Sequence, residues 1–209
     1  MNTPNKLSLL RIILVPFILL FLLPVHIGSF EPSGWNQFID SYGRIIAAIL
    51  FVVASLTDLV DGKIARKYNL ITNLGKFLDS LADKMLVISI LIALVDLGRI
   101  SSVFVIIIVI REFMVTGIRL IASNKGVVMA AEMIGKIKTV TQMIAITFIM
   151  FEPIFQIILT SCFSSISEKS VNTGILYIGN SFMIIAVIMT IISGMDYLMK
   201  NLDYFKECK

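Results

Sequence analysis

Four aspartates stand close together in a strongly apolar part of the chain. Asp58 and Asp61 are three residues apart, and Asp79 and Asp83 are four residues apart. On a helix, residues at these spacings project from one face, so each pair would present two carboxylates together. Clustered carboxylates repel one another unless cations neutralise them, and Mg²⁺ and Mn²⁺ prefer hard oxygen ligands. The pattern therefore predicts a divalent-metal site shared by two helices.

A plainer interpretation is that these aspartates lie at solvated helix ends and form surface salt bridges with neighbours such as Arg66. An ionised carboxylate near hydrocarbon costs at least about 2.5–3.5 kcal/mol, so carboxylates at membrane depth usually have a partner and a function. Gly62, Ala65 and Gly75 are also spaced among the aspartates, and small residues allow a backbone or ligand to approach closely. These features favour the metal site.

Four basic residues further along the chain form a second candidate site. Arg111 falls in the middle of an apolar segment, so we expect it to face the interior of a helix bundle. Arg119 follows eight residues later, about two helical turns, and therefore lies on nearly the same face. Lys136 and Lys138 begin the next apolar segment. Together the four predict a pocket for a phosphate-bearing substrate, in which arginine supplies paired donors.

Two other interpretations of these cations remain open. Arg111 would be neutralised by an ion pair with the adjacent Glu112 or with another buried acid. Lys136 and Lys138 would be ordinary basic anchors at the cytoplasmic start of a membrane helix. In either case the basic residues would serve folding or topology rather than a substrate.

The composition indicates a membrane protein of several spans. The chain has 209 residues, of which 57% are hydrophobic and 15% are charged, whereas soluble domains carry about 25% charged residues. We expect residues 1–209 to form a single domain, because the apolar segments are joined by short linkers. The formal charge of +4 suits an anionic membrane surface and does not require a nucleic-acid partner.

An all-α bundle follows from the apolar segments, since about 20 apolar residues span a bilayer as a helix. Six such segments are predicted, at about 7–24, 42–60, 79–97, 101–122, 138–160 and 173–198. Glu152 and Pro153 interrupt the fifth segment and are expected to kink or end its helix, which leaves the limits of that helix open.

The distribution of basic residues predicts the orientation of this bundle. Most of them fall on one set of loops and helix ends, whereas only Arg44, Arg99 and Lys169 fall on the opposite set. Because basic residues are enriched on the cytoplasmic side, both termini should be cytoplasmic. The aspartate pairs then lie at the cytoplasmic ends of the second and third helices, where a water-soluble substrate is available.

The sequence D-x-x-D-G-x-x-A-R, which starts at Asp58, is followed by G-x-x-x-D-x-x-x-D, which starts at Gly75. This double motif resembles the signature of the CDP-alcohol phosphotransferases at every specified position. The resemblance implies a membrane enzyme that forms a homodimer and uses two divalent ions, Mg²⁺ or Mn²⁺. It also implies that Asp58, Asp61 and Asp79 bind metal, and that Asp83 both contacts metal and acts as the general base.

The same resemblance implies a site for a CDP-linked lipid, whose diphosphate the metal ions would hold. Gly62 and Ala65 would leave room for the nucleotide, and Arg66 and Thr72 would lie near its phosphate or cytidine. The residues expected to contact the CDP-lipid are Asn5, Ser8, Gly62, Ala65, Arg66, Thr72 and Gly75.

Further motifs are similar to those of the phosphatidylglycerophosphate synthases within this family. They are R-E-x-x-x-x-x-x-R at Arg111, G-K-x-K-T-x-x-Q-M at Gly135, and the opening P-N-x-L-S-x-x-R at Pro4, in which Ser8 replaces a threonine. The implied reaction transfers the phosphatidyl group of CDP-diacylglycerol to sn-glycerol 3-phosphate and releases CMP, a step of phospholipid biosynthesis at the cell membrane. The four basic residues described above would bind the phosphate of the acceptor.

Two alternatives to this reaction remain. Within the family, the acceptor would be inositol phosphate or phosphatidylglycerol. In another class of protein, a divalent-cation transporter would use the four carboxylates as its pathway. The basic cluster argues against a transporter, because Arg and Lys do not usually line the entry of a cation pathway, and release of CMP by the purified protein would distinguish the two.

Overall fold

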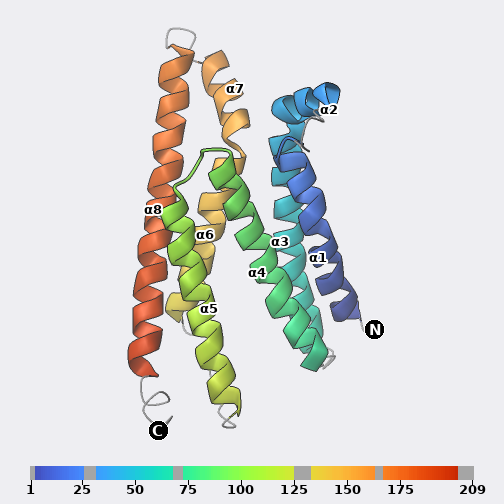
Figure 1. Cartoon of the computed structure of the whole chain (residues 1–209), viewed down its shortest axis with the longest axis vertical. Helices are drawn as coiled ribbons and strands as arrows, with labels where there is room; N and C mark the ends of the chain where they lie inside the picture. Colours follow the sequence, from blue (N-terminus) through green and yellow to red (C-terminus); the bar gives the residue numbers. More distant parts are fainter. Residues whose placement is uncertain (1–2, 26–31, 68–72, 125–132, 163–166, 202–209) are drawn as a thin grey trace.

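The computed structural model describes residues 3–25, 32–67, 73–124, 133–162 and 167–201, without the side chains of residues 3–6, 58–67, 73, 74, 76 and 124. All regular secondary structure in this part of the chain is helical, which confirms the all-α prediction (Figure 1). The elements are α1 (Thr3–Leu22), α2 (Ser33–Phe38), the π-helical η1 (Ile39–Gly43), α3 (Arg44–Lys67), α4 (Asn73–Asp96), α5 (Ser102–Asn124), α6 (Met133–Met150), α7 (Glu152–Cys162) and α8 (Glu168–Lys200).

Each of the six predicted apolar segments coincides with helical structure. In the described part of the chain, three helical stretches are long and apolar enough to cross a membrane: Ser33–Thr57, Met133–Met150 and Glu168–Lys200. The apolar stretch of α1, Leu7–Leu22, is shorter. The described part of the chain is therefore all-helical with three candidate membrane spans, and six crossings stay a prediction. Short α2, which runs through η1 into α3, was not predicted.

The helices form two packed groups that share one core. α1 packs against both α3 and α4, and α8 packs against α5, α6 and α7 (Figure 1). Contacts of α3 with α6 and of α4 with α5 join the groups. The shared core contains Phe51, Leu91, Ile108 and Ile146, one from each of the joining helices, and none of these side chains is exposed. This core fixes α4, α5 and α6 relative to one another, and these helices line the pocket described below.

The fifth predicted segment is two helices. α6 ends at Met150 and α7 begins at Glu152, which confirms the expected break, because Pro153 has no N–H to donate and is tolerated in a first helical turn. The carboxylate of Glu152 is 1% exposed and pairs with Arg44 (2.8 Å) and Arg99 (3.3 Å). A buried carboxylate with two cations ties this break to the start of α3 and to the residues that follow α4.

Two glycines have positions that their conformation or size requires. Gly98 ends α4 with a φ of +66°, and the N–H of Arg99 reaches back to the carbonyl of Leu94 at 2.9 Å; this is the usual glycine-terminated end of a helix. A Cβ at Gly43 would lie 2.2 Å from the carbonyl oxygen of Phe21. Glycine therefore permits the close contact between α1 and η1, which helps to place α1 beside α4.

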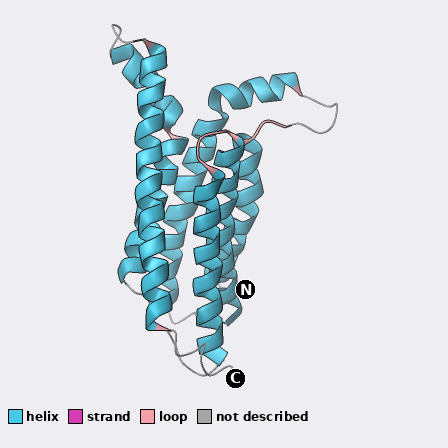
Figure 2. Ribbon diagram, turned by 60° about the vertical axis from the view of Figure 1, so that its left-hand side comes forward, coloured by secondary structure: helices cyan, strands magenta, loops and turns pink. Residues whose placement is uncertain are grey.

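The start of α1 and the end of α8 lie at the same end of the bundle, as both views show (Figures 1 and 2). This arrangement is compatible with the prediction that both termini lie on the same side of a membrane. The side of the membrane that this end faces stays a prediction.

Candidate active site

The two described aspartates of the predicted metal site lie one turn apart on α4. Asp79 has a side chain that is 52% exposed, and its Oδ1 lies 3.4 Å from Ser8 Oγ and 3.5 Å from Arg11 Nη1, both donors on α1. Ser8 and Arg11 are themselves 3% and 1% exposed. One oxygen of Asp79 therefore faces a buried cation, while the carboxylate as a whole stays open to the surface.

The remaining predicted ligands of the metal and the CDP-lipid fall largely outside the described side chains. Asp58, Asp61, Gly62, Ala65 and Arg66 belong to the last turns of α3, and Asn5 to the first turn of α1, but only their backbone is described. Thr72 lies wholly outside the described residues. Gly75 is on α4, one turn before Asp79.

Because α3 ends at Lys67 and α4 begins at Asn73, the two aspartate pairs flank one short connection between helices. Among the described side chains, no group of three or more His, Cys, Asp or Glu residues is placed to hold a metal ion. Asp79 and Asp83 supply two of the four predicted ligands, and their carboxylate oxygens have the donor chemistry that suits Mg²⁺ or Mn²⁺. The described half of the set therefore fits a divalent ion.

Asp83 lies at a pocket of about 230 Å³ between α4, α5 and α6, which we call the basic pocket. Its wall is formed by Ser80, Asp83, Lys84, Arg111, Glu112, Val115, Thr116, Arg119, Gly135, Lys136 and Thr139. Four basic and two acidic side chains are thus present, a formal excess of two positive charges. Three of the four predicted phosphate-binding residues share this wall with the predicted general base.

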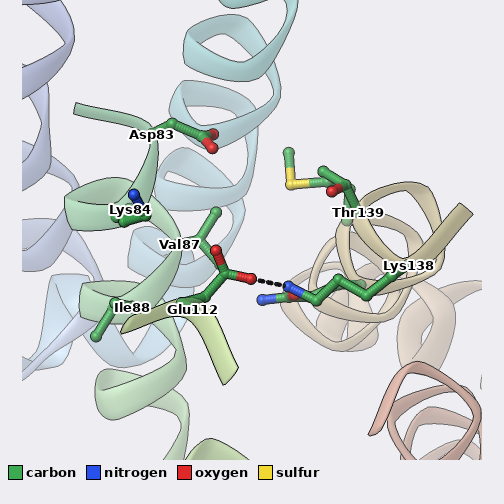
Figure 3. Close-up of a pocket in the computed structure, with 9 residues that line it drawn as sticks. Asp83, Lys84, Val87, Ile88, Glu112, Lys138 and Thr139 are labelled. Atoms are coloured by element: carbon green, nitrogen blue, oxygen red, sulfur yellow. Dashed lines mark hydrogen bonds and ion pairs between the residues drawn. The ribbon is translucent and has the colours of Figure 1, made fainter. Parts of the chain in front are cut away.

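Lys138, the fourth predicted phosphate-binding residue, lines a smaller neighbouring pocket of about 30 Å³ together with Asp83 and Glu112. Figure 3 shows Asp83 on one side of this space, Thr139 and Lys138 on the other, and the ion pair between Lys138 Nζ and Glu112 Oε1. Lys138 is 3% exposed, so it is not an ordinary surface anchor. The volume is enough for about one water molecule.

Glu112 forms ion pairs with two of the four predicted phosphate-binding residues, Lys138 and Arg111. Its Oε1 accepts from Lys138 and also from Arg111 Nη1, at 3.1 Å. The alternative pairing of Arg111 with its neighbour is therefore real, and it coexists with a place for Arg111 in the wall of the basic pocket. Burying a charge is costly unless it is paired, and this shared carboxylate offsets that cost for both cations.

The sequence suggests Glu112 only as a partner for Arg111, but in the structure Glu112 lines both pockets. The signal that pointed to it is an acidic residue in the middle of an apolar segment, directly beside a basic one. Arg119 and Lys136 are exposed residues of the basic pocket. The structure thus separates an exposed pair of cations from a network around Glu112 in which Lys138 is buried and Arg111 is half-buried.

The chain resembles known proteins over nearly its whole length. Residues 1–192 match the family model described as CDP-alcohol phosphatidyltransferase. The CDP-diacylglycerol–glycerol-3-phosphate 3-phosphatidyltransferase of Bacillus subtilis is 39% identical over 206 residues, which cover 98% of this chain and 97% of the relative. The protein of the same name from Rickettsia felis is 33% identical, covering 100% and 96%.

A probable phosphatidylglycerophosphate synthase of Mycobacterium tuberculosis strain H37Rv is 33% identical over 202 residues, or 96% of this chain and 82% of the relative. The three alignments cover between 96% and 100% of this chain. The family match extends through α1 to most of α8. The chain therefore belongs to the CDP-alcohol phosphatidyltransferase family.

Proposed function

We propose that this protein transfers the phosphatidyl group of CDP-diacylglycerol to sn-glycerol 3-phosphate, forming phosphatidylglycerophosphate, the precursor of phosphatidylglycerol, and CMP. Two relatives with almost full coverage carry the name of this reaction. Family membership favours an enzyme over a divalent-cation transporter. The observation that carries the choice of acceptor is the basic pocket, which brings cations and the predicted general base to one wall.

The charge of the basic pocket matches that of the proposed acceptor. The side chains of its wall carry a formal excess of two positive charges, and glycerol 3-phosphate carries close to two negative charges at neutral pH. Arg119 and Lys136, the exposed cations, would bind the phosphate, with Arg111 and Lys138 behind them. Arginine suits this task because its planar fork of donors binds two phosphate oxygens at once.

We propose that Asp58, Asp61, Asp79 and Asp83 hold two divalent ions, Mg²⁺ or Mn²⁺. Membership of this family supports dependence on a divalent metal. When bound, the ions would neutralise the diphosphate of the CDP-lipid and polarise the phosphorus under attack. Arg11 beneath Asp79 would orient this carboxylate, since Arg11 Nη1 lies 3.5 Å from Asp79 Oδ1.

The CDP-lipid would bind beside these aspartates at Asn5, Gly62, Ala65, Arg66, Thr72 and Gly75. Ser8, which was expected in the same group, donates to Asp79, so its contribution would pass through that carboxylate. Small residues on α3 would let the nucleotide approach the helix backbone. The acceptor and the CDP-lipid would then lie on either side of Asp83.

Asp83 is the proposed general base. Its carboxylate would take the proton of the acceptor hydroxyl, and the hydroxyl oxygen would form a bond to the lipid-proximal phosphorus. The bond from this phosphorus to the oxygen of CMP would break, and CMP would leave. Such proton transfer requires the base to lie within hydrogen-bond reach of the hydroxyl, which is the arrangement that a phosphate held in the basic pocket would favour.

We place the protein in the cell membrane, as a single domain of residues 1–209 that crosses the membrane six times. Both termini and the site would lie on the cytoplasmic face, and two copies would form a homodimer. The exposed apolar side chains along the helices, such as Ile106 and Ile110 on α5, are compatible with contact with lipid. Cytoplasmic exposure of the site would give it access to a soluble phosphorylated acceptor.

An acceptor panel tests this function. Purified protein is incubated with radiolabelled CDP-diacylglycerol, Mg²⁺ and one acceptor at a time: glycerol 3-phosphate, glycerol, inositol phosphate or phosphatidylglycerol. We expect labelled phosphatidylglycerophosphate and CMP with glycerol 3-phosphate only. Preference for another acceptor would keep the family chemistry and overturn the proposed substrate, and absence of CMP with every acceptor would overturn the enzyme itself.

A further inference from the structure

Helix α8 contacts both arginines of the basic pocket, although it supplies none of the described residues that line the pocket. The contacts come from Ser193 and Tyr197, which are each 4% exposed. The two residues are four positions apart on α8, so they face the same neighbour, which is α5 with its Arg111 and Arg119.

Ser193 accepts a hydrogen bond from Arg111, the less exposed of the two arginines, which we call the inner arginine. Arg111 Nη2 donates to Ser193 Oγ at 2.6 Å, while Nη1 donates to Glu112 at 3.1 Å. The stem of Arg111 lies against Gly194, where an added Cβ would meet Arg111 Cγ at 3.1 Å. The guanidinium therefore has a partner at each end, one on its own helix and one on α8, and its plane is set by both.

Tyr197 contacts Arg119, the more exposed of the two arginines, which we call the outer arginine. Arg119 Nε donates to Tyr197 Oη at 3.3 Å, and the guanidinium carbon lies 5.5 Å from the centre of the tyrosine ring. This contact uses Nε, so the two Nη groups of Arg119 are left for a bidentate contact with an anion. A long, exposed arginine would otherwise sample many rotamers, and ordering it only on binding would weaken the affinity.

We propose that Ser193 and Tyr197 are positioning residues for the acceptor: they orient Arg111 and Arg119 in the wall of the basic pocket before glycerol 3-phosphate binds. This inference rests on the proposed function. Neither residue would touch the acceptor, the CDP-lipid or the metal ions. Their effect would pass entirely through the two arginines, and this separates them from residues that merely pack α8.

Replacing Tyr197 tests the outer contact. Tyr197→Phe removes the hydroxyl and keeps the ring, so acceptor kcat/KM should fall about 3–10-fold, mainly through a higher acceptor KM. The KM of CDP-diacylglycerol should not change. The matched control is Tyr177→Phe, a tyrosine of the same helix that is 70% exposed, and its kinetics should equal those of the parent.

A double-variant cycle decides whether Tyr197 acts through Arg119. In an Arg119→Gln background the guanidinium is absent, so Tyr197→Phe should have little further effect on acceptor kcat/KM. Residues that act through one contact show this non-additivity, whereas independent residues give multiplied losses. A purely structural role for Tyr197 would lower activity in both backgrounds by the same factor.

Ser193 tests the inner contact independently. Ser193→Ala should lower acceptor kcat/KM about tenfold, because a donor on a charged group loses its acceptor, and Ser193→Thr, which keeps a hydroxyl, should recover part of that loss. Ser181→Ala, at an exposed serine of the same helix, is the control. If Ser193→Ala does not fold, the Tyr197 cycle still decides the proposal.

Two results would overturn this inference while leaving the proposed function intact: an acceptor KM unchanged in Tyr197→Phe, or multiplied losses in the cycle with Arg119→Gln. A parent enzyme that does not use glycerol 3-phosphate would overturn the proposed function and this inference together. The parent is measured first, so the two failures are distinguishable.

Discussion

Arg119 offers the most direct test of the basic pocket, because it is exposed and its described contacts are with a single side chain. Arg119→Gln removes the charge and keeps a polar side chain of similar reach. Its contacts with Tyr197 are a hydrogen bond of 3.3 Å and a cation–π contact, so their loss should leave the bundle folded. The variant therefore reports on substrate binding more than on stability.

The size of the effect follows from exposure. A hydrogen bond to a charged group contributes about 1.5–3 kcal/mol, and solvent screening of an exposed pair places Arg119 near the lower limit. About 1.5 kcal/mol corresponds to about a tenfold loss in acceptor kcat/KM. Lys138→Gln should behave differently, since Lys138 is buried and paired with Glu112: we expect a less stable protein as well as a slower one.

The assay measures the initial rate of labelled lipid formation in detergent micelles. Glycerol 3-phosphate is varied at saturating CDP-diacylglycerol, and in a second series CDP-diacylglycerol is varied at saturating glycerol 3-phosphate. Lys169→Gln, which removes one exposed positive charge from the far part of α8, is the control for net charge. Acceptor kcat/KM should fall for Arg119→Gln and not for Lys169→Gln, and the KM of the CDP-lipid should stay constant in both. Equal kinetics for Arg119→Gln and the parent would refute the role of this arginine in binding phosphate.

Three further predictions concern the metal site, the topology and the fold. Asp79→Asn and Asp83→Asn should each lower the rate at least about 100-fold, because positioned charge is removed, and EDTA should abolish activity until Mg²⁺ or Mn²⁺ is added; full activity in chelator would contradict the metal site. A single cysteine at Asn69 should react with an impermeant thiol reagent only from the cytoplasm, and one at Ser33 only from outside, in a chain without its own cysteines; reaction of both from one side would refute the topology. Glu152→Ala should lower the free energy of unfolding by about 3–5 kcal/mol, since it leaves two cations without their buried partner; a thermal unfolding curve that matches the parent would show that this ion-pair cluster adds nothing.

The sequence by itself determined the class of fold and predicted the chemistry of the site. Runs of about 20 apolar residues predict membrane helices, because a backbone in lipid must satisfy its own hydrogen bonds. The spacing of Asp79 and Asp83 places them on one face for the same local reason. The break at Glu152 was also predictable, since Pro153 limits a helix whatever surrounds it.

Only the tertiary structure decided which side chains meet across helices. Nothing local to Lys138 says that its partner is Glu112, which precedes it by 26 residues on another helix. Periodicity within one helix does not reveal which neighbour that helix faces, or at what height. The division of four similar cations into a pair bound to Glu112, with Lys138 buried and Arg111 half-buried, and an exposed pair, Arg119 and Lys136, therefore appears only once α5 and α6 are packed.

The contacts of α8 with the two arginines likewise depend on the tertiary structure. In the sequence, Ser193 and Tyr197 are two polar residues near the end of a long apolar segment, and their types fit an interfacial position equally well. Their contacts with Arg111 and Arg119 join residues 82 and 78 positions apart. Such contacts depend on the register between two packed helices, which is set by the whole core and cannot be read from either helix alone.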